Sequence, residues 1–320
     1  MPRVMIIDAL NMFIRNYVIN PSLSPNGQPV GGICGSIKSL QKLCKEINPD
    51  QIIICHDGEG GSTKRKKMNK EYKAGRKPIH LNRDVRNLTE NEELQNKIWQ
   101  LTRLAEFYNQ LPVIQLLYPN IEADDLISYT ARSPIYKDYQ KVIVSADKDF
   151  IQLIEEKTIL FRPIQDEILT VKKVVEDYKI HPNNFALARS ITGDTSDNLK
   201  GIKGAGMATV AKRFPMLSET TSHRINDIKR YASEQESSLK IYQSVIDEIQ
   251  IIENNYKIMQ LSSPQISLQV KNKINNIIEN FIPEMNQTEF KKMSIQDGFA
   301  VIDFSGLFST MKKIMATKDE

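Results

Sequence analysis

The sequence predicts an α/β protein with a mostly parallel, doubly wound sheet and a largely helical C-terminal part. Short runs rich in Val and Ile alternate with segments of helical apolar spacing over about the first 160 residues, and this rhythm is typical of parallel sheets. Beyond that stretch the apolar spacing is helical almost throughout. A chain of 320 residues can bury one large core or two modest ones, and we expect units at 1–180 and 181–320.

Each expected element has its own signal. Four β-branched runs are too short for helices, so we expect strands at Arg3–Ile7, Gln51–Cys55, Pro112–Leu117 and Lys141–Ser145. Apolar residues recur at helical spacing in Gly35–Ile47, Asn91–Gln110, Ala123–Ala131, Pro182–Ile191, Ala205–Phe214 and Ser238–Ile252. A short strand is expected at Ala300–Phe304, and the Ser/Thr-rich stretch Leu217–His223 is expected to be a linker.

The composition is that of an ordinary globular protein, with 40% hydrophobic and 26% charged residues. No stretch approaches the roughly 20 apolar residues of a membrane span, and Asp8 interrupts the first apolar run, which argues against a signal peptide. Cys34, Cys44 and Cys55 are too few and too dispersed for a disulfide framework, so we expect buried thiols in a reducing compartment. These features together predict a cytoplasmic protein without a membrane partner.

Positive charge is concentrated in one segment, although the net charge is only +4. The basic residues of this segment are Lys64, Arg65, Lys66, Lys67, Lys70, Lys73, Arg76 and Lys77, against the single acid Glu71. Such a block is the electrostatic footprint of a phosphate backbone, the alternative being a solvated loop. With Tyr72 beside it, the block also fits a single-strand groove with a stacking platform, unless Tyr72 is a core contact.

Acidic residues follow the predicted strands. Asp8 closes the first strand, Asp57 follows the second by two residues, and Asp147 and Asp149 come just after the strand at 141–145. Because ligands gather at the carboxyl ends of parallel strands, we expect these acids at one edge of the sheet. A helix start adds Glu122, Asp124 and Asp125, and a turn beyond the sheet adds Asp194 and Asp197. For any single acid at a helix start, capping is the alternative role.

Carboxylates gathered this closely require bound cations. Two like charges about 4 Å apart cost roughly 4 kcal/mol at an effective dielectric constant near 20. His56, His80, His181 and His223 are scattered, so the available ligands are oxygens, which favours Mg²⁺, with Mn²⁺ as a substitute, over zinc. Two such ions stabilise the attacking and leaving oxygens of an in-line phosphoryl displacement.

Six motifs in order carry a resemblance to a known family. They are IIDALN at Ile6–Asn11, HDG at His56–Gly58, EYKAGR at Glu71–Arg76, EADD at Glu122–Asp125, SADKDF at Ser145–Phe150 and GDTSDNLKGIKGAGMAT at Gly193–Thr209. Over residues 1–215 the chain resembles the 5′-nuclease family: flap endonucleases, bacteriophage 5′→3′ exonucleases and the 5′-nuclease domain of bacterial DNA polymerase I. The resemblance implies a PIN-like core and metal-dependent hydrolysis of DNA near 5′ ends or flaps, in replication or repair. No polymerase domain follows, so we expect a free-standing nuclease, and its size and basic tail resemble those of phage members.

The resemblance also implies roles for individual residues. The first metal site would use Asp8, Asp57, Glu122 and Asp124, the second would use Asp147, Asp149, Asp194 and Asp197, and Asp125 would lie near both. Lys73 and Arg76 resemble the basic residues that reach the scissile phosphate. Arg65 and Tyr72 match positions that hold the phosphate and stack a base. The segment from about Lys64 to Arg103 would form a helical arch through which a 5′ single strand passes.

A glycine-rich segment follows the last acids. Gly201, Gly204 and Gly206 do not fit a dinucleotide fingerprint, because no strand precedes them and no ribose-binding acid follows at the expected distance. They fit a helix–hairpin–helix turn, where glycines let backbone N–H groups approach a phosphate and Lys203 and Lys212 add charge. The alternative is a tight structural turn. The family uses this element to hold duplex DNA, often with K⁺ in the turn.

Two other functions remain open from the sequence. One is a structure-selective DNA-binding protein without catalysis, which would be expected to lack several of the carboxylates. The other is a PIN-type ribonuclease, which is usually shorter and lacks the arch and the hairpin element. The expected partners of a monomeric nuclease are 5′-flap, nicked or 5′-ended duplex DNA, with RNA–DNA hybrids and replication proteins left open.

Overall fold

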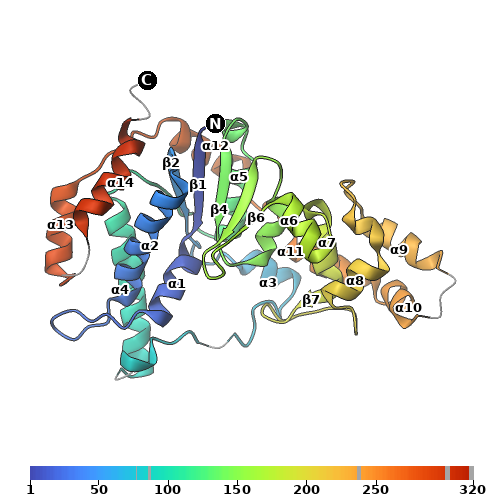
Figure 1. Ribbon diagram of the computed structural model, residues 1–320. Coiled ribbons are helices and arrows are strands. Elements are labelled where there is room, and N and C mark those ends of the chain that lie inside the picture. The colour runs from blue at the N-terminus through green and yellow to red at the C-terminus, as the bar shows by residue number, and fades with distance from the viewer. Residues whose placement is uncertain (77, 86–87, 236–238, 300–302, 317–320) are drawn as a thin grey trace.

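A computed structural model describes residues 1–320 except 77, 86–87, 236–238, 300–302 and 317–320 (Figure 1). Its main sheet has the strand order β3-β2-β1-β4-β5-β6, in which β1 to β5 are parallel and β6 is antiparallel. The strands are β1 (Arg3–Asp8), β2 (Gln51–Cys55), β3 (Ile114–Leu116), β4 (Gln140–Val144), β5 (Thr158–Arg162) and β6 (Glu167–Leu169). A separate hairpin pairs β7 (Gly193–Asp194) with β8 (Leu199–Lys200). The predicted mostly parallel sheet is therefore confirmed.

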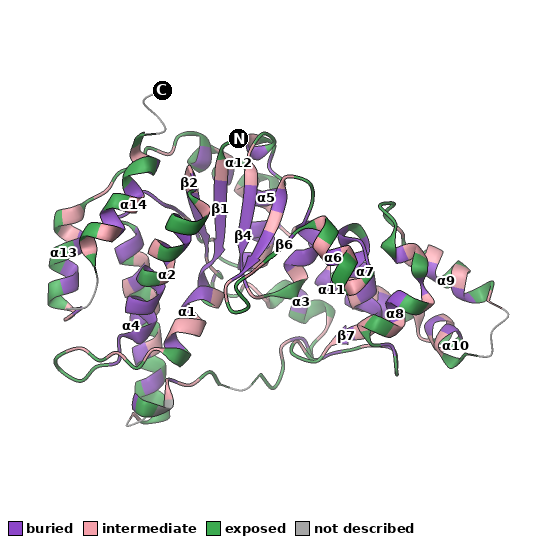
Figure 2. Ribbon diagram, in the orientation of Figure 1, coloured by how far each residue is buried: buried purple, intermediate pink, exposed green. Residues whose placement is uncertain are grey.

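The sheet is covered by helices on both faces, as a doubly wound fold requires. Side chains alternate along β1, so that Val4 and Ile6 enter one core while Met5 and Ile7 enter the other. The Met5 face packs against α1 (Ala9–Ile19), α2 (Gly31–Ile47), α4 (Glu90–Tyr108), α13 (Gln287–Gln296) and α14 (Phe304–Ala316). The Val4 face packs against α5 (Ala123–Ala131), α7 (Pro182–Thr192) and α12 (Leu268–Glu279). Figure 2 shows the strands largely buried between these layers.

The remaining helices lie mostly to one side of the sheet. Figure 1 shows α7 to α10 extending away from the sheet beyond β6, on the side opposite α13 and α14. The helices not yet given are α3 (Thr63–Met68), α6 (Val171–Tyr178), α8 (Met207–Arg213), α9 (Ile225–Ser233), α10 (Lys240–Asp247) and α11 (Ile249–Met259). Short 3₁₀ turns are η1 (Arg83–Val85), η2 (Pro134–Tyr136), η3 (Lys148–Leu153) and η4 (Pro215–Ser218).

Most expected elements of the first half are present, and several others were not foreseen. The helix predicted over 123–131 and the strand predicted over 51–55 have the predicted bounds, while α2 begins four residues earlier than expected. The sequence reading missed α1, α3, α6, β5 and β6. The start of α1 had a usable signal, because the Asp8 carboxylate accepts a hydrogen bond from the Asn11 amide as its N-cap.

Three expectations in the second half need correction. The helix predicted over Ser238–Ile252 is two helices, because the chain breaks at Glu248 between α10 and α11. The strand predicted over 300–304 has residues 300–302 outside the described part, and Phe304 begins α14 instead. Phe304 and Phe308 pack against Phe290 of α13, a tertiary contact that strand propensity does not anticipate. The linker expected over 217–223 begins inside η4.

The helix α11 follows α10 in the chain and packs beside α7 and β8. The Asn255 side-chain amide donates hydrogen bonds to the carbonyl of Ser190 in α7, at 3.0 Å, and of Lys200 in β8, at 2.8 Å. At the end of α11, Gln152 of η3 donates to the Met259 carbonyl and accepts from the Leu261 amide. Residues from η3, α7, β8 and α11, which are far apart in the sequence, are therefore joined by hydrogen bonds.

The cysteines and the length of the helices bear on the bulk properties of the chain. Cys34, Cys44 and Cys55 are all free and buried, as predicted. No helix in the described part is long and apolar enough to cross a membrane.

Candidate active site

The fold brings the acids predicted at three strand ends to one edge of the sheet. Asp8 is the last residue of β1 and pairs in register with Cys55 of β2, two residues before Asp57. The strand β4 lies on the other side of β1 and leads to Asp147. The strand order reverses between β1 and β4, so Asp8 and Asp147 flank the switch point where open parallel sheets bind their ligands.

Asp8 is almost fully buried, and both of its carboxylate oxygens are hydrogen-bonded. Oδ1 accepts from the Asn11 amide at 3.0 Å, and Oδ2 accepts from the Ser145 hydroxyl at 3.0 Å. Burial, helped by the neighbouring charges of Asp57 and Asp147, raises the pKa of Asp8 to about 7 against the lowering effect of these hydrogen bonds. Asp8 therefore caps a helix and also lies within the acidic cluster.

The start of α5 contributes a second set of acids. Asp57 Oδ1 accepts a hydrogen bond from the Ala123 amide at 2.9 Å, which joins the end of β2 to this helix. Burial, and then the charge of Asp147, hold the pKa of Asp124 well above its usual range. The Asp125 carboxylate accepts hydrogen bonds from Arg65 at 3.1 Å and from the Gln265 amide at 3.0 Å. The ligand role expected for Asp125 stays a prediction.

Glu122 is buried between two basic side chains. Its carboxylate forms an ion pair with Arg65 and another with Lys73, whose Nζ lies 2.6 Å from Oε1. Burial pushes the pKa of Glu122 upward, but the charges of Arg65 and Lys73 outweigh it and hold the pKa below its ordinary value. Glu122 is therefore ionised and balanced by protein cations.

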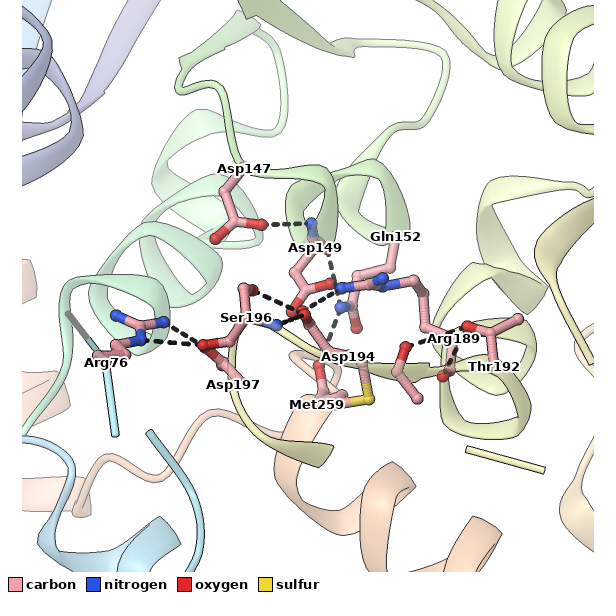
Figure 3. A network of polar contacts seen from close by, with 11 residues as sticks. Arg76, Asp147, Asp149, Gln152, Arg189, Thr192, Asp194, Ser196, Asp197 and Met259 are labelled. Carbon is pink, nitrogen blue, oxygen red and sulfur yellow. Dashed lines mark hydrogen bonds and ion pairs between the residues drawn. The ribbon is translucent and has the colours of Figure 1, made fainter. Parts of the chain in front are cut away.

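A further group of acids lies beyond β4, and Figure 3 shows it from close by. Asp147 is the N-cap of η3 and accepts from the Asp149 amide at 2.8 Å. Asp194 in β7 and Asp197 in the β7–β8 turn approach from the other side. Asp197 and Asp194 both raise the pKa of Asp147, after desolvation, which shows that these carboxylates lie within electrostatic range. We call Asp147, Asp149, Asp194 and Asp197 the second acidic group.

The donor set of this edge suits a hard divalent cation. All the candidate ligands are carboxylate oxygens, and desolvation first, followed by Asp147, raises the pKa of Asp149 to about 7. Burial and a neighbouring acid thus both disfavour the ionised form of the Asp124 and Asp149 carboxyls, a combination that is common at functional sites. Within the described ranges, however, no three His, Cys, Asp or Glu side chains are already arranged to hold a metal ion. Several carboxylates are instead turned toward Arg or Lys side chains.

The basic segment reaches the acids from the opposite side. In the view of Figure 1, the chain between α3 and α4 passes below the carboxyl ends of the strands. Arg76 forms an ion pair with Asp197, and the Lys73 amide donates to the Asp197 carbonyl at 2.9 Å. Lys73 has a φ of 57°, a left-handed conformation that is uncommon for a residue with a side chain. The fold thus brings both predicted catalytic cations to the acidic edge.

The helical arch expected over 64–103 is helical only at its ends and at η1 among the described residues. Gly75, with a φ of 69°, and Lys73 both interrupt a continuing helix, as does Pro78. Lys77, the last member of the predicted basic block, lies outside the described residues. The phosphate-binding role of this basic segment stays a prediction, whereas the helical backbone expected for most of it is wrong.

Arg65 and Tyr72 are placed differently from the other basic-segment residues. Arg65 is 4% exposed and contacts Glu122, Asp125 and the Ile258 carbonyl, so it is held inside the protein. The Tyr72 ring is 3% exposed and belongs to a small apolar cluster with Leu199, Ile258 and Met259. In this conformation neither side chain faces solvent, and their phosphate-holding and stacking roles stay predictions.

The glycine-rich segment forms a turn between two helices. Gly204 has a φ of 79°, and a side chain at Gly201 would collide with the Thr192 carbonyl oxygen. Gly206 is the N-cap of α8, which therefore starts two residues later than predicted, and Lys203 and Lys212 are exposed. A two-residue strand, β8, does precede this segment, contrary to the sequence reading, but it belongs to the hairpin and not to the main sheet.

Sequence reasoning missed the residues that support the acids. Arg189 of α7 contacts Asp149 and Asp194, Ser145 donates to Asp8, and Gln152 ties η3 to the chain after α11. Ser145 stood inside a motif and could have been noticed. The pairing of Arg189 depends on how α7 packs against η3, which no local pattern encodes.

Comparisons with known proteins agree with this geometry. Residues 3–179 match the family model described as the 5′-3′ exonuclease, N-terminal resolvase-like domain. A 5′-3′ exonuclease of Aquifex aeolicus is 28% identical over 271 residues, which are 82% of this chain and 82% of that protein. The thermostable DNA polymerase I of Thermus aquaticus is 31% identical over 211 residues, 66% of this chain but only 23% of the polymerase. A solved bacteriophage T5 flap endonuclease with DNA and metal ions has a TM-score of 0.68 at 19% identity, over 87% of this chain and 98% of that one, a likeness of fold.

Proposed function

The chain belongs to the 5′-3′ exonuclease family, and on that premise we propose that it is a 5′→3′ exonuclease and flap endonuclease acting on DNA. Its reaction is the hydrolysis of a phosphodiester near a 5′ end or flap, dependent on divalent metal ions, for which we propose Mg²⁺. The named relatives include a 5′-3′ exonuclease and a flap endonuclease, which supports both activities.

One observation carries this proposal. Acids from the ends of β1, β2 and β4 lie at the edge where the strand order reverses. Lys73 and Arg76 of the basic segment pair with two further acids of the candidate site, Glu122 and Asp197. A site that joins incompletely balanced carboxylates to cations suits a phosphate diester held by metal ions. Carboxylates that only capped helices would not need to share one edge.

The proposed metal ligands are the acids of this edge. Asp8, Asp57, Glu122 and Asp124 would hold one ion, and the second acidic group would hold the other, because carboxylate oxygens are the ligands that Mg²⁺ prefers. When bound, the ions would stabilise the charge that develops on the attacking and leaving oxygens. The conformation described here keeps Glu122 against Arg65 and Lys73, so these partners must share or release it on metal binding.

The basic residues would bind and orient the substrate. Unlike the enclosed Arg65, Lys73 and Arg76 pair with the acids from more exposed positions, and each would stabilise negative charge on the scissile phosphate. The Arg76 side chain is 52% exposed, so it is free to exchange its carboxylate partner for a phosphate. Lys203, Lys212 and the open backbone at Gly204 and Gly206 would hold the duplex without reading its sequence.

The test is a cleavage assay with substrates labelled at both ends. Flap, nicked, single-stranded and RNA–DNA substrates are compared in Mg²⁺ and in chelator. We expect cutting near the 5′ end of the flap and the nick, and none in chelator. Tight binding without cutting would indicate a silent binding protein, and preferential cutting of RNA would indicate a PIN-type ribonuclease.

A further inference from the structure

Arg189 bridges two carboxylates of the second acidic group. Its Nε lies 3.0 Å from Asp149 Oδ1, and its Nη2 forms an ion pair with Asp194 Oδ2. Figure 3 shows the guanidinium contacting both of these side chains, which come from η3 and β7. The Arg189 side chain is 16% exposed, so the bridge is largely shielded from solvent.

The backbone that carries Arg189 is fixed. Arg189 lies in the last turn of α7, and its carbonyl accepts from the Gly193 amide that ends the helix and from the Thr192 hydroxyl. The carbonyl of the next residue, Ser190, accepts a hydrogen bond from the Asn255 side chain of α11. The guanidinium is therefore delivered from a rigid helix end and not from a loop.

Both carboxylate oxygens of Asp194 already accept hydrogen bonds from protein donors. While Oδ2 is paired with Arg189, Oδ1 accepts from the Ser196 amide at 2.8 Å and from the Ser196 hydroxyl at 2.6 Å. A cation that uses Asp194 must therefore displace Arg189 or Ser196, or share an oxygen with one of them. An arginine stays charged at any pH that the protein survives, so its opposition to a cation does not vanish by deprotonation.

In the described part of the chain, the ion pairs of the second acidic group are made by two arginines. Arg76 pairs with Asp197 and is half exposed, whereas Arg189 pairs with Asp149 and Asp194 and is nearly enclosed. Arg76 comes from the basic segment, which the proposed function assigns to the substrate. Arg189 comes from the scaffold, so its charge remains whether or not DNA is present.

We propose that Arg189 is a positioning residue that serves as a built-in counterion of the second acidic group and sets its affinity for divalent cations. Without a cation it holds Asp149 and Asp194 together against their mutual repulsion. With a cation nearby, its positive charge opposes binding. This inference rests on the proposed function only in taking the second acidic group as a cation site.

Removing Arg189 should raise the affinity for a cation but lower the stability of the cation-free protein, so the two effects can be measured separately. Replacing Arg189 with Gln removes the opposing charge, so the affinity for a divalent cation should rise, by about tenfold or more for charges a few ångströms apart. The same change leaves the carboxylates unbalanced in chelator, so the protein should be less stable there. Arg189→Lys keeps the charge but loses the two-pronged contact.

The first measurement is calorimetric titration of the full chain with Mn²⁺ alone. We expect Arg189→Gln to bind at least one Mn²⁺ about tenfold more tightly than wild type, and Arg189→Lys to stay within about threefold. Arg230→Gln is the matched control, since it removes an arginine from exposed α9 that also pairs with an aspartate, and it should leave Mn²⁺ affinity unchanged. Unchanged or weaker Mn²⁺ binding by Arg189→Gln would overturn the proposal.

The second measurement is the melting temperature in chelator and in saturating Mg²⁺. In chelator, Arg189→Gln should melt about 3 °C or more below Arg230→Gln, and Mg²⁺ should close most of that gap. An equal deficit in both conditions would mean that Arg189 only supports packing. A wild-type chain that binds no Mn²⁺ would overturn the proposed function as well. If wild type binds Mn²⁺ and Arg189→Gln leaves its affinity unchanged, only the proposed role of Arg189 is overturned.

Discussion

Lys73 Nζ lies 2.6 Å from Glu122 Oε1, so a residue proposed to bind phosphate is paired with a residue proposed to bind metal. The pair joins the segment after α3 to the start of α5. Because Lys73 also has a left-handed backbone, its side chain is directed by local conformation as well as by charge. Substrate binding must therefore compete with an existing ion pair.

This pairing leads to a prediction for the basic residues. Lys73→Ala and Arg76→Ala should each lower the single-turnover rate in Mg²⁺ by about 100-fold or more, because they act on charge in the transition state. Substrate affinity should change little. Rapid-quench kinetics at saturating enzyme measures the rate, and fluorescence anisotropy measures the affinity.

Lys203→Ala is the contrasting variant. Its side chain is exposed at the turn before α8, so it should weaken duplex binding and reduce the salt dependence of that binding. Turnover at saturating enzyme should be near normal. Effects in the reverse pattern, with Lys203 controlling the rate and Lys73 the affinity, would contradict the assignment.

A second prediction tests the acids as a cation site. In chelator, Asp147→Asn or Asp149→Asn should leave DNA binding unchanged or tighten it by about 1 kcal/mol, since one repulsive charge is removed. In Mg²⁺ the same variants should lose orders of magnitude in single-turnover rate. An acid that served only as a cap would show neither effect, and two variants that cut at wild-type speed would exclude the two-metal proposal.

The third prediction concerns pH. The pKa of Asp8 is raised from 3.8 to about 7, so between these values the folded chain keeps a proton that the unfolded chain has lost. In chelator this group therefore makes folding less stable as pH rises from about 4 to about 7, at about 1.4 kcal/mol per pKa unit. Asp8→Asn retains an N-cap and should remove this loss.

The measurement is the unfolding free energy of wild type and Asp8→Asn in chelator across that pH range. Wild type should lose at least about 2 kcal/mol relative to the variant as pH rises. Mg²⁺ should remove the loss at high pH, because cations bind the ionised carboxylate. Parallel pH profiles of the two proteins would show that Asp8 does not titrate in this range.

The fourth prediction concerns the path of the 5′ strand. If the segment between α3 and α4 encloses the strand, a free 5′ end is needed to pass through it. A bulky adduct attached to the 5′ end before protein is added should suppress cutting while leaving duplex binding nearly intact. Equal cutting of blocked and open flaps would contradict an enclosing segment.

The fifth prediction separates the two roles of Tyr72. The ring is buried with Leu199, Ile258 and Met259, so Tyr72→Ala should lower the unfolding free energy by about 3 kcal/mol in chelator. Tyr72→Phe should be nearly neutral for stability and for cutting. A Tyr72→Ala protein of normal stability with weakened single-strand binding would instead support the stacking role.

The sheet and the position of the acids could be predicted because both depend on local signals. A β-branched run predicts its own strand, and an acid just past it, such as Asp57 after β2, must lie at the carboxyl edge. The backbone between α3 and α4 could not be predicted in this way. Its lysines indicate charge, but the left-handed turn at Lys73 depends on contacts with Asp197 and Glu122 across the site.

The side chains that contact the acids could not be predicted from the sequence either. Asp149 and Asp194 were identified from their motifs, yet nothing local indicates that Arg189 lies between them. The buried state of Arg65 also depends on Ile258, which is 193 positions away. Motifs therefore identified the candidate acids and cations that the fold brings to one edge, and tertiary packing determined what each of them faces.

The contacts of α11 have a practical consequence for shortening the chain. The motifs end near residue 209, so a truncation that kept every one of them would discard Asn255, Ile258 and Met259. Such a fragment would lose the hydrogen bonds to Ser190, Lys200, Arg65 and Gln152 and would uncover Tyr72. A search for the smallest active piece would then find an insoluble or inactive product although every motif residue is present. The part of the chain without motifs thus packs against α7, β8 and η3, next to the second acidic group.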